Sequence, residues 1–230
     1  MLRLTNLASL AVVAAALTAT SHAGVITVPS GLSPGSQFRL IFVTADTTDA
    51  SSADIATYNS FVSNEANMNA LLAGISWSAI GTTETVNAIN NIGAETGIPV
   101  YNLAGNLVVS TTVLLFNGPS TAYSNPINID QFGNTLETNV WTGTWDGGTI
   151  QPGTITALGD VPPKVGLSSS TDYNAYDAGS SFNTVNWGMY GISAVLTVPA
   201  ASAVPEPGSM GLIGLGSIVV VAARRKFRAR

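Results

Sequence analysis

Between its two ends, the chain shows first one strand pattern and then two helix patterns. Residues 38–44 are a nearly continuous β-rich apolar run, which is typical of a buried strand. Residues 51–54 match a capping box. Beyond it, apolar residues recur at helical spacing, namely Ile55, Tyr58, Val62 and Ala66. We therefore predict a first helix that Gly74 ends, and a second, shorter helix from Glu84 to about Ile92.

Further along the chain, the pattern changes to short strands and loops. Residues 100–109 predict two strands around a glycine turn, and residues 111–116 predict another strand. Residues 117–187 are rich in Asn, Gly, Pro, Ser and Thr, and their most apolar island is 139–145. Residues 190–198 alternate, which predicts a last strand with one buried face.

Two early helices followed by short strands and long loops predict an α+β fold. This order resembles the C-type-lectin-like fold, in which a loop-rich region opens near a Trp-x-Gly island, here residues 140–143, and closes with a strand after another tryptophan, here Trp187. The resemblance implies a loop-rich antiparallel β region in which residues 38–44 and 190–198 pair in one sheet. The sequence lacks that family's disulfides and its Glu-Pro-Asn and Trp-Asn-Asp sugar–calcium motifs. A β-sandwich body stays open as the alternative.

The N-terminus has the parts of a signal peptide in the required order. Arg3 precedes an apolar run over residues 7–19, and Ser21-His22-Ala23 fits a small-x-small cleavage site. We predict that residues 1–23 form a signal helix that is cut off after Ala23, and that residues 24–199 form an extracytoplasmic domain. Cleavage removes His22, the one histidine, and the chain contains no cysteine. The mature protein would therefore contain neither residue type.

The C-terminus combines a short motif, an apolar stretch and a basic end. Residues 200–207 form a linker that includes Pro205, Glu206 and Pro207. Residues 208–223 are apolar or small, and as a helix they would span roughly 24 Å, which is short for a hydrocarbon core of about 30 Å. We predict a transmembrane sorting helix there, because the basic tail of residues 224–230 would stay in the cytoplasm. The basic residues are Arg224, Arg225, Lys226, Arg228 and Arg230.

This tripartite tail resembles the PEP-CTERM sorting signal of Gram-negative bacteria. The resemblance implies export by the general secretory route, processing by signal peptidase, and recognition by an exosortase, which is a membrane-embedded processing enzyme. The C-terminal helix would hold an inner-membrane intermediate before the protein reaches the cell surface or the extracellular matrix. Proteins with this tail are associated with biofilm and exopolysaccharide, so exopolysaccharide is an expected partner.

The charge and the missing residue types of the body exclude several functions. Residues 24–204 hold two cations, Arg39 and Lys164, against twelve acids, which gives −10, whereas the whole chain carries −5. Such a body repels phosphate backbones, so nucleic acid is excluded as a partner. Without His or Cys, zinc sites built on them and histidine-based triads are excluded as well. The Gly-x-Ser-x-Gly match at residues 31–35 contains a proline and is predicted to be a turn. We therefore expect a protein that is not an enzyme.

The long loop segment carries the candidate binding chemistry. Residues 117–187 hold three of the four tryptophans and six of the twelve body acids, and loops of this length in compact domains are functional or disordered. We expect core packing for Trp77, Trp141 and Trp187. The candidate binding surface consists of Trp145, Asp146, Asp172 and Tyr173. The turns at residues 146–148 and 172–174 contain oxygen ligands, but the ligand spacing of an EF-hand is absent. We therefore predict no metal and no other cofactor, with calcium left open as the alternative.

The leading functional hypothesis is a lectin-like binding module at the cell surface or in the matrix. A secreted carbohydrate-active enzyme is the first alternative, and it would need two carboxyl groups about 5 to 9.5 Å apart in one cleft. A purely structural matrix protein is the second alternative.

Overall fold

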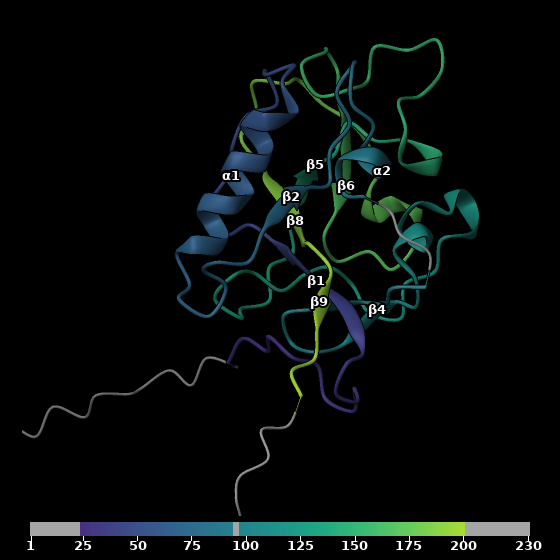
Figure 1. The fold of residues 1–230 in the computed structure, drawn as a ribbon. Coiled ribbons are helices and arrows are strands. Elements are labelled where there is room, and N and C mark those ends of the chain that lie inside the picture. The colour runs from purple at the N-terminus through teal and green to yellow at the C-terminus, as the bar shows by residue number, and fades with distance from the viewer. Residues whose placement is uncertain (1–23, 94–96, 201–230) are drawn as a thin grey trace, which may run out of the picture.

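The structure is a computed structural model that describes residues 24–93 and 97–200 (Figure 1). Its strands are β1 (Gln37–Val43), β2 (Trp77–Ala79), β3 (Val100–Asn102), β4 (Leu107–Val109), β5 (Asn139–Trp141), β6 (Lys164–Leu167), β7 (Gly179–Ser180), β8 (Gly188–Ser193) and β9 (Leu196–Thr197). Its α-helices are α1 (Ile55–Asn67) and α2 (Ala88–Asn91). Its 3-10 helices are η1 (Thr112–Phe116), η2 (Gly118–Ser120), η3 (Asp146–Gly148) and η4 (Tyr173–Ala175). The body is therefore dominated by strands and loops, with few helices.

The described strands join into one mixed sheet in the order β4-β3-β1-β8-β5-β6-β7, with β2 beside β8 and β9 beside β1. The first and last strand segments pair antiparallel, with Ile41 opposite Ile192 and Gln37 opposite Thr197, which confirms that the body brings its ends together. Two pairs are parallel, β1 with β3 and β5 with β8, so the expectation of an antiparallel region was wrong for them. The single connected sheet also disagrees with the β-sandwich alternative. The resemblance to the C-type-lectin-like fold is not confirmed and stays a prediction.

Two hydrophobic cores lie on the two faces of this sheet, and β1 contributes to both. Its side chains alternate between the faces because successive residues of a strand point to opposite sides. Leu40 and Phe42 belong to the core that α1 covers with Tyr58, Val62 and Ala66. Ile41 and Val43 belong to the core that residues of α2 and η1 cover. Figure 1 shows α1 on one side of the sheet and the short helices on the other. The near-continuous apolar run of the first strand follows from this two-sided burial.

The last long strand is more deeply buried than its sequence predicted. All six residues of β8 are buried, because β8 lies in the middle of the sheet with β1, β2 and β5 as neighbours. Trp77 of β2 packs edge-on against Phe42, with ring centroids 4.9 Å apart. The prediction of one strand over residues 190–198 was wrong, because the segment is divided into β8 and β9. Both faces are buried as far as Ser193, whereas residues 194–197 are exposed or half-buried. Gly191 leaves room for the Phe42 ring, since a Cβ at Gly191 would lie 2.5 Å from Phe42 Cε1.

The first helix starts later and ends earlier than predicted. Asp54 is its N-cap, and the Asp54 carboxylate accepts a hydrogen bond of 2.9 Å from the backbone N–H of Ala56. Ser51 does not cap the helix, because its hydroxyl donates to Asp49 at 2.6 Å. The helix ends at Asn67, and Gly74 instead closes a turn further along with φ of 84°. The apolar spacing was right, and the capping-box interpretation was wrong.

Two further predictions were wrong in extent or in type. The second helix covers only Ala88–Asn91, because residues 83–86 form a turn in which the Thr83 N–H donates to Val86 O at 2.9 Å. Residues 111–116 contain the 3-10 helix η1 and no strand. Its buried residues Thr112, Leu115 and Phe116 recur at helical spacing, while Val113 and Leu114 are exposed. The spacing of the buried residues, three and four apart, is that of a helix and not of a strand.

The predicted targeting segments lie outside the described residues. These are the signal helix of residues 1–23, the sorting motif Pro205, Glu206 and Pro207, the apolar segment 208–223 and the basic tail 224–230. Among the helices of residues 24–93 and 97–200, none is long and apolar enough to cross a membrane. The two ends of the described body leave it on the same side (Figure 1).

Candidate functional site

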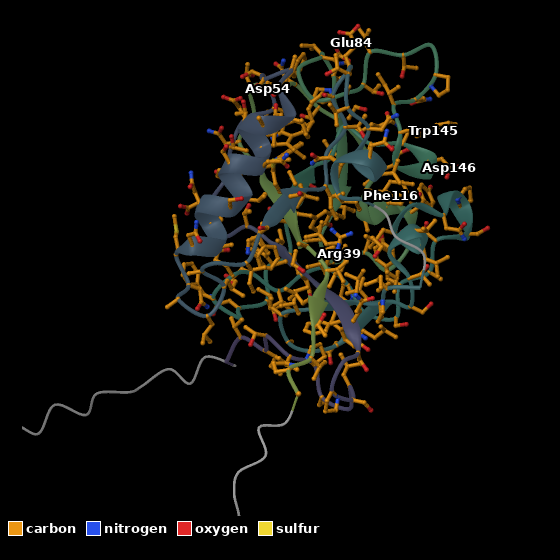
Figure 2. All side chains as sticks on the ribbon, viewed as in Figure 1. Arg39, Asp54, Glu84, Phe116, Trp145 and Asp146 are labelled. Atoms are coloured by element: carbon orange, nitrogen blue, oxygen red, sulfur yellow. The ribbon has the colours of Figure 1, made fainter. Side chains whose placement is uncertain are left out.

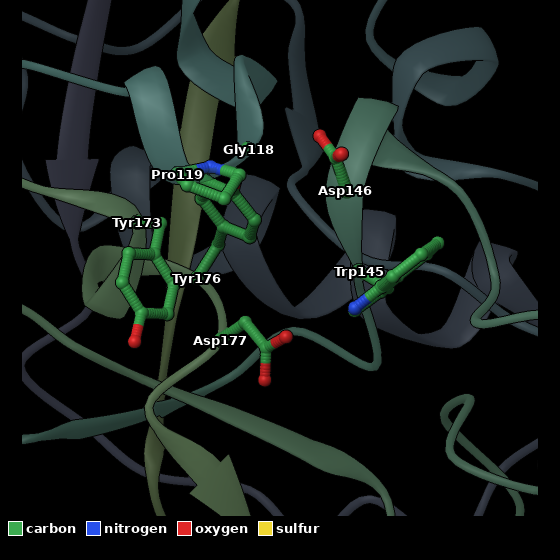
Figure 3. Close-up of a pocket in the computed structure, with 7 residues that line it drawn as sticks. All are labelled: Gly118, Pro119, Trp145, Asp146, Tyr173, Tyr176 and Asp177. Atoms are coloured by element: carbon green, nitrogen blue, oxygen red, sulfur yellow. The ribbon is translucent and has the colours of Figure 1, made fainter.

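A small pocket of about 170 Å³ lies where three loop segments meet beside the sheet (Figure 3). The lining residues come from η2, from the turn at η3 and from the turn at η4. They are Gly118, Pro119, Trp145, Asp146, Tyr173, Tyr176 and Asp177. Two acids and three aromatic rings therefore face one small space.

A tight turn presents Trp145 and Asp146 to the pocket. The Trp145 N–H donates to Thr149 O at 2.8 Å, and the Gly148 N–H donates back to Trp145 O at 3.1 Å. Gly147 and Gly148 both have positive φ, 71° and 72°, which glycine adopts without steric cost. A side chain on Gly148 would also collide with Phe116, since its Cβ would lie 2.7 Å from Phe116 Cδ2. The Asp-Gly-Gly sequence thus anchors the turn against η1 and leaves Trp145 half-buried at the surface.

Asp172 shapes the neighbouring turn and does not line the pocket. Its exposed carboxylate accepts hydrogen bonds from the Ser170 hydroxyl at 2.6 Å and from the Asn174 backbone N–H at 2.9 Å, so it caps η4. These bonds to Ser170 and Asn174 lower the pKa of Asp172. The capped turn holds Tyr173, which is 42% exposed, at the side of the pocket.

Tyr176 forms the buried back of the pocket. Its ring packs edge-on against Phe116, with ring centroids 5.7 Å apart, and its carbonyl accepts a 2.6 Å hydrogen bond from the Thr142 hydroxyl. Burial is the main cause that raises the pKa of Tyr176, and the charges of Asp146 and Asp177 raise it as well. The phenol therefore stays protonated at neutral pH, and its hydroxyl shares a hydrogen bond of 3.4 Å with the Thr121 hydroxyl.

The two pocket acids differ in their partners. Asp177 forms an ion pair with Lys164, with 2.7 Å between Asp177 Oδ1 and Lys164 Nζ, and both side chains are mostly buried. The Asp146 carboxylate lies against the Cα of Gly118, where a Cβ would come within 2.5 Å of Asp146 Oδ1. Among the described residues, no donor forms a hydrogen bond to this carboxylate. Asp146 thus offers a negative charge to whatever enters the pocket.

The aromatic side chains border the pocket on different sides. Figure 3 shows Trp145 on one side, Tyr173 on the other, Tyr176 behind them and Asp177 between. The indole N–H of Trp145 points toward the space near Asp177 in this view, and no described residue accepts a hydrogen bond from it. Pockets that bind small molecules have this composition, with apolar and aromatic walls and a few placed polar groups.

The structure brings together three of the four predicted surface residues. Trp145, Asp146 and Tyr173 line the pocket, whereas Asp172 supports it through the cap of η4. Sequence reasoning missed Tyr176, Asp177, Gly118 and Pro119, which line it too. A signal for two of them existed, because Asp172-Tyr173 is followed after two residues by a second aromatic–acid pair, Tyr176-Asp177.

The other tryptophans are packed as predicted. Trp77 and Trp141 are 6% and 0% exposed, and the Trp141 indole N–H donates to the carbonyls of Thr48 and Val185. Trp187 is half-buried and packs on Trp141, with ring centroids 4.6 Å apart. This leaves Trp145 as the tryptophan at the pocket.

Neither a second hollow nor the acids elsewhere in the described residues form a comparable site. A wider and more open hollow of about 460 Å³ lies along residues 137–139 beside Leu167 and Ser169, and no aromatic residue lines it. Within the described residues, no group of three or more acids lies close enough together to hold a metal ion.

Comparison with known proteins identifies the tail. The family model of the PEP-CTERM protein-sorting motif matches residues 203–226, which include Pro205, Glu206 and Pro207. No curated protein matches the chain. The match confirms the predicted sorting signal and, with it, export and processing at the membrane. The chain therefore carries the PEP-CTERM sorting signal of an exosortase substrate.

Proposed function

We propose that the exported body is a glycan-binding protein of the cell surface or extracellular matrix, that it is not an enzyme, and that the pocket at Trp145 holds one sugar ring. The observation that carries the proposal is the joint presence of Trp145, Tyr173 and Asp146 around one space of about 170 Å³. A cavity of about 150 Å³ holds a benzene ring, so this space suits a single six-membered ring. Aromatic faces stack on the apolar face of a sugar, and carboxylates accept hydrogen bonds from its hydroxyls.

The surroundings of the pocket support the same proposal. The sorting signal implies export and processing at the membrane, so the body would meet ligands outside the cytoplasm. The loops that form the site are packed on the sheet through Phe116 and Tyr176, so the walls are held in place before a ligand arrives. A preformed site loses little conformational entropy on binding.

A secreted carbohydrate-active enzyme is the second candidate, because Asp146 and Asp177 line the same pocket. Glycosidases act with a pair of carboxyl groups on either side of the scissile bond. Against this candidate, Asp177 is engaged by Lys164 at 2.7 Å, and a pocket this small leaves little room for both a sugar and a water. Release of reducing ends from a bound polysaccharide, lost in Asp146→Asn, would favour the enzyme.

Glycan-array binding by the full chain, purified in detergent, tests the proposal. Trp145→Ala should weaken binding roughly tenfold, because one stacked aromatic ring is worth about 1 kcal/mol or slightly more. Thermal stability should change little, because Trp145 is only half-buried. Phe182→Ala is the matched control, since Phe182 is 70% exposed and does not line the pocket. If Trp145→Ala unfolds the body, Trp145 is a core residue and the site is wrong. If no glycan binds, the result favours the alternative of a purely structural matrix protein.

A further inference from the structure

We infer that the sugar for which this pocket is built carries a free amine, as a 2-amino-2-deoxyhexose residue does. The inference rests on the proposed function, because it names the class of sugar that the same pocket would take. Three observations carry it: the aromatic walls, the unpartnered Asp146 carboxylate, and the distribution of positive charge in the body.

Both basic side chains of the body, Arg39 and Lys164, already bind other groups of the body. Arg39 is 3% exposed, and its guanidinium donates to the carbonyls of Ile92 at 2.6 Å and Ser193 at 2.7 Å. Lys164 is held by Asp177 at the edge of the pocket. Residues 24–200 contain no other Lys or Arg. A uronate or sulfated sugar would therefore meet acids at this surface without a free cation, and its charge would be repelled.

The pocket is lined by groups that bind an ammonium ion, namely a carboxylate and aromatic rings. Asp146 is acceptor-only when ionised, and it is the pocket acid without a cation beside it, because Asp177 is paired with Lys164. An ammonium group has three N–H donors and no acceptor. Trp145 and Tyr173 add two partly exposed aromatic rings, and the face of such a ring attracts a cation within about 6 Å. A cation beside the Asp146 carboxylate and these rings gains interactions that a neutral hydroxyl does not.

Acylation of the amine should remove this advantage. An acetylated amine has no charge and one N–H donor, and its acetyl group must find room in a pocket of about 170 Å³ that one ring already occupies. Charge-assisted hydrogen bonds are roughly twice as strong as neutral ones. The pocket should therefore distinguish the free amine from the acetylated one by charge and by size together.

Calorimetric titration of the full chain with four defined tetrasaccharides tests the inference. The probes are a glucosamine tetramer, an N-acetylglucosamine tetramer, a cellotetraose and a tetragalacturonate. The glucosamine tetramer should bind at least about tenfold more tightly than the other three. Its affinity should fall as salt is raised, because screening weakens the contact with Asp146.

Two variants separate the pocket from the general acidity of the body. Asp146→Asn keeps the shape and removes one charge at the pocket, so it should lower glucosamine binding about tenfold and leave cellotetraose binding unchanged. Glu84→Gln removes the same charge at the upper edge of the body, away from Trp145 and Asp146 (Figure 2). That variant should bind glucosamine as the wild type does.

The possible results are distinguishable. Tighter binding of the N-acetylated, neutral or acidic tetramer would overturn the amine preference and leave glycan binding in place. Equal losses in Asp146→Asn and Glu84→Gln would overturn it as well, because attraction by bulk charge would then suffice. Absence of binding to any tetramer, together with a blank glycan array, would overturn the proposed function itself.

Discussion

The ion pair between Lys164 and Asp177 offers the sharpest test of how the site is held. It joins β6 to the turn that carries Tyr173 and Tyr176, and the side chains of Lys164 and Asp177 are 15% and 13% exposed. Lys164→Met keeps most of the aliphatic stem and removes the charge. The Asp177 carboxylate would then remain mostly buried without its cation. Loss of one partner of a buried pair costs about 3 to 5 kcal/mol, and the partial exposure here places our expectation at about 3 kcal/mol.

A double-mutant cycle measures this coupling. The free energy of unfolding is obtained from urea titrations followed by tryptophan fluorescence, with Lys164→Arg as the control that keeps the charge. A loss of about 3 kcal/mol corresponds to a fall in melting temperature of about 6 to 12 °C for a body of this size. Adding Asp177→Asn to Lys164→Met removes the unpaired charge and should recover at least half of the loss.

A cost of less than about 0.5 kcal/mol for Lys164→Met would contradict a buried pair, because that is the range of an exposed one. Simple addition of the effects of Lys164→Met and Asp177→Asn would contradict it as well. In either case the pair would be a surface contact, and another interaction would hold the turn of η4 against β6.

The remaining predictions concern a buried acid and the tail. Glu65 is 2% exposed and accepts hydrogen bonds from Gln131 Nε2 at 2.7 Å and from the Asp46 N–H at 3.0 Å; burial raises its pKa above the ordinary 4.5. A carboxyl whose pKa is higher in the folded than in the unfolded state stabilises the fold at a pH below its unfolded pKa, and this contribution is lost as the pH rises through its folded pKa. Glutamine does not titrate. The free energy of unfolding of Glu65→Gln should therefore rise relative to that of the wild type from about pH 4 to about pH 7. Urea titrations of both proteins at these two pH values check this. The same difference in the free energy of unfolding at both pH values would contradict it. Deletion of residues 205–230 should leave export intact and release the body prematurely, as cell fractionation would show, whereas retention of the truncated protein in the inner membrane would count against the sorting account.

Local sequence patterns determined the elements whose signal is contained in a few neighbouring residues. The first strand follows from its apolar run, and α1 follows from the spacing of Tyr58, Val62 and Ala66. The Asp-Gly-Gly turn at residue 146 follows from the φ values that glycine allows. The sorting signal was predictable for the same reason, since its three parts are adjacent in the chain.

The candidate site was predictable only in part. Trp145, Asp146 and Tyr173 could be named because they lie in turns of a long polar segment, where side chains are exposed. Nothing local places the turn at Trp145 beside the turn at Tyr176, since this neighbourhood depends on the packing of both turns around Phe116. The ion pair of Lys164 with Asp177 depends likewise on the pairing of β6 with β7.

Strand order and burial were decided by the tertiary structure. The alternation of β8 predicts one exposed face, but three neighbouring strands and the elements packed over the sheet cover both faces. The parallel pairs β1–β3 and β5–β8 require crossovers, whose course depends on contacts between residues far apart in the chain. A local pattern reports which side of an element is apolar. Which partner covers that side depends on the packing of the whole chain, because hydrophobic burial is non-directional and favours any arrangement that removes enough apolar surface from water.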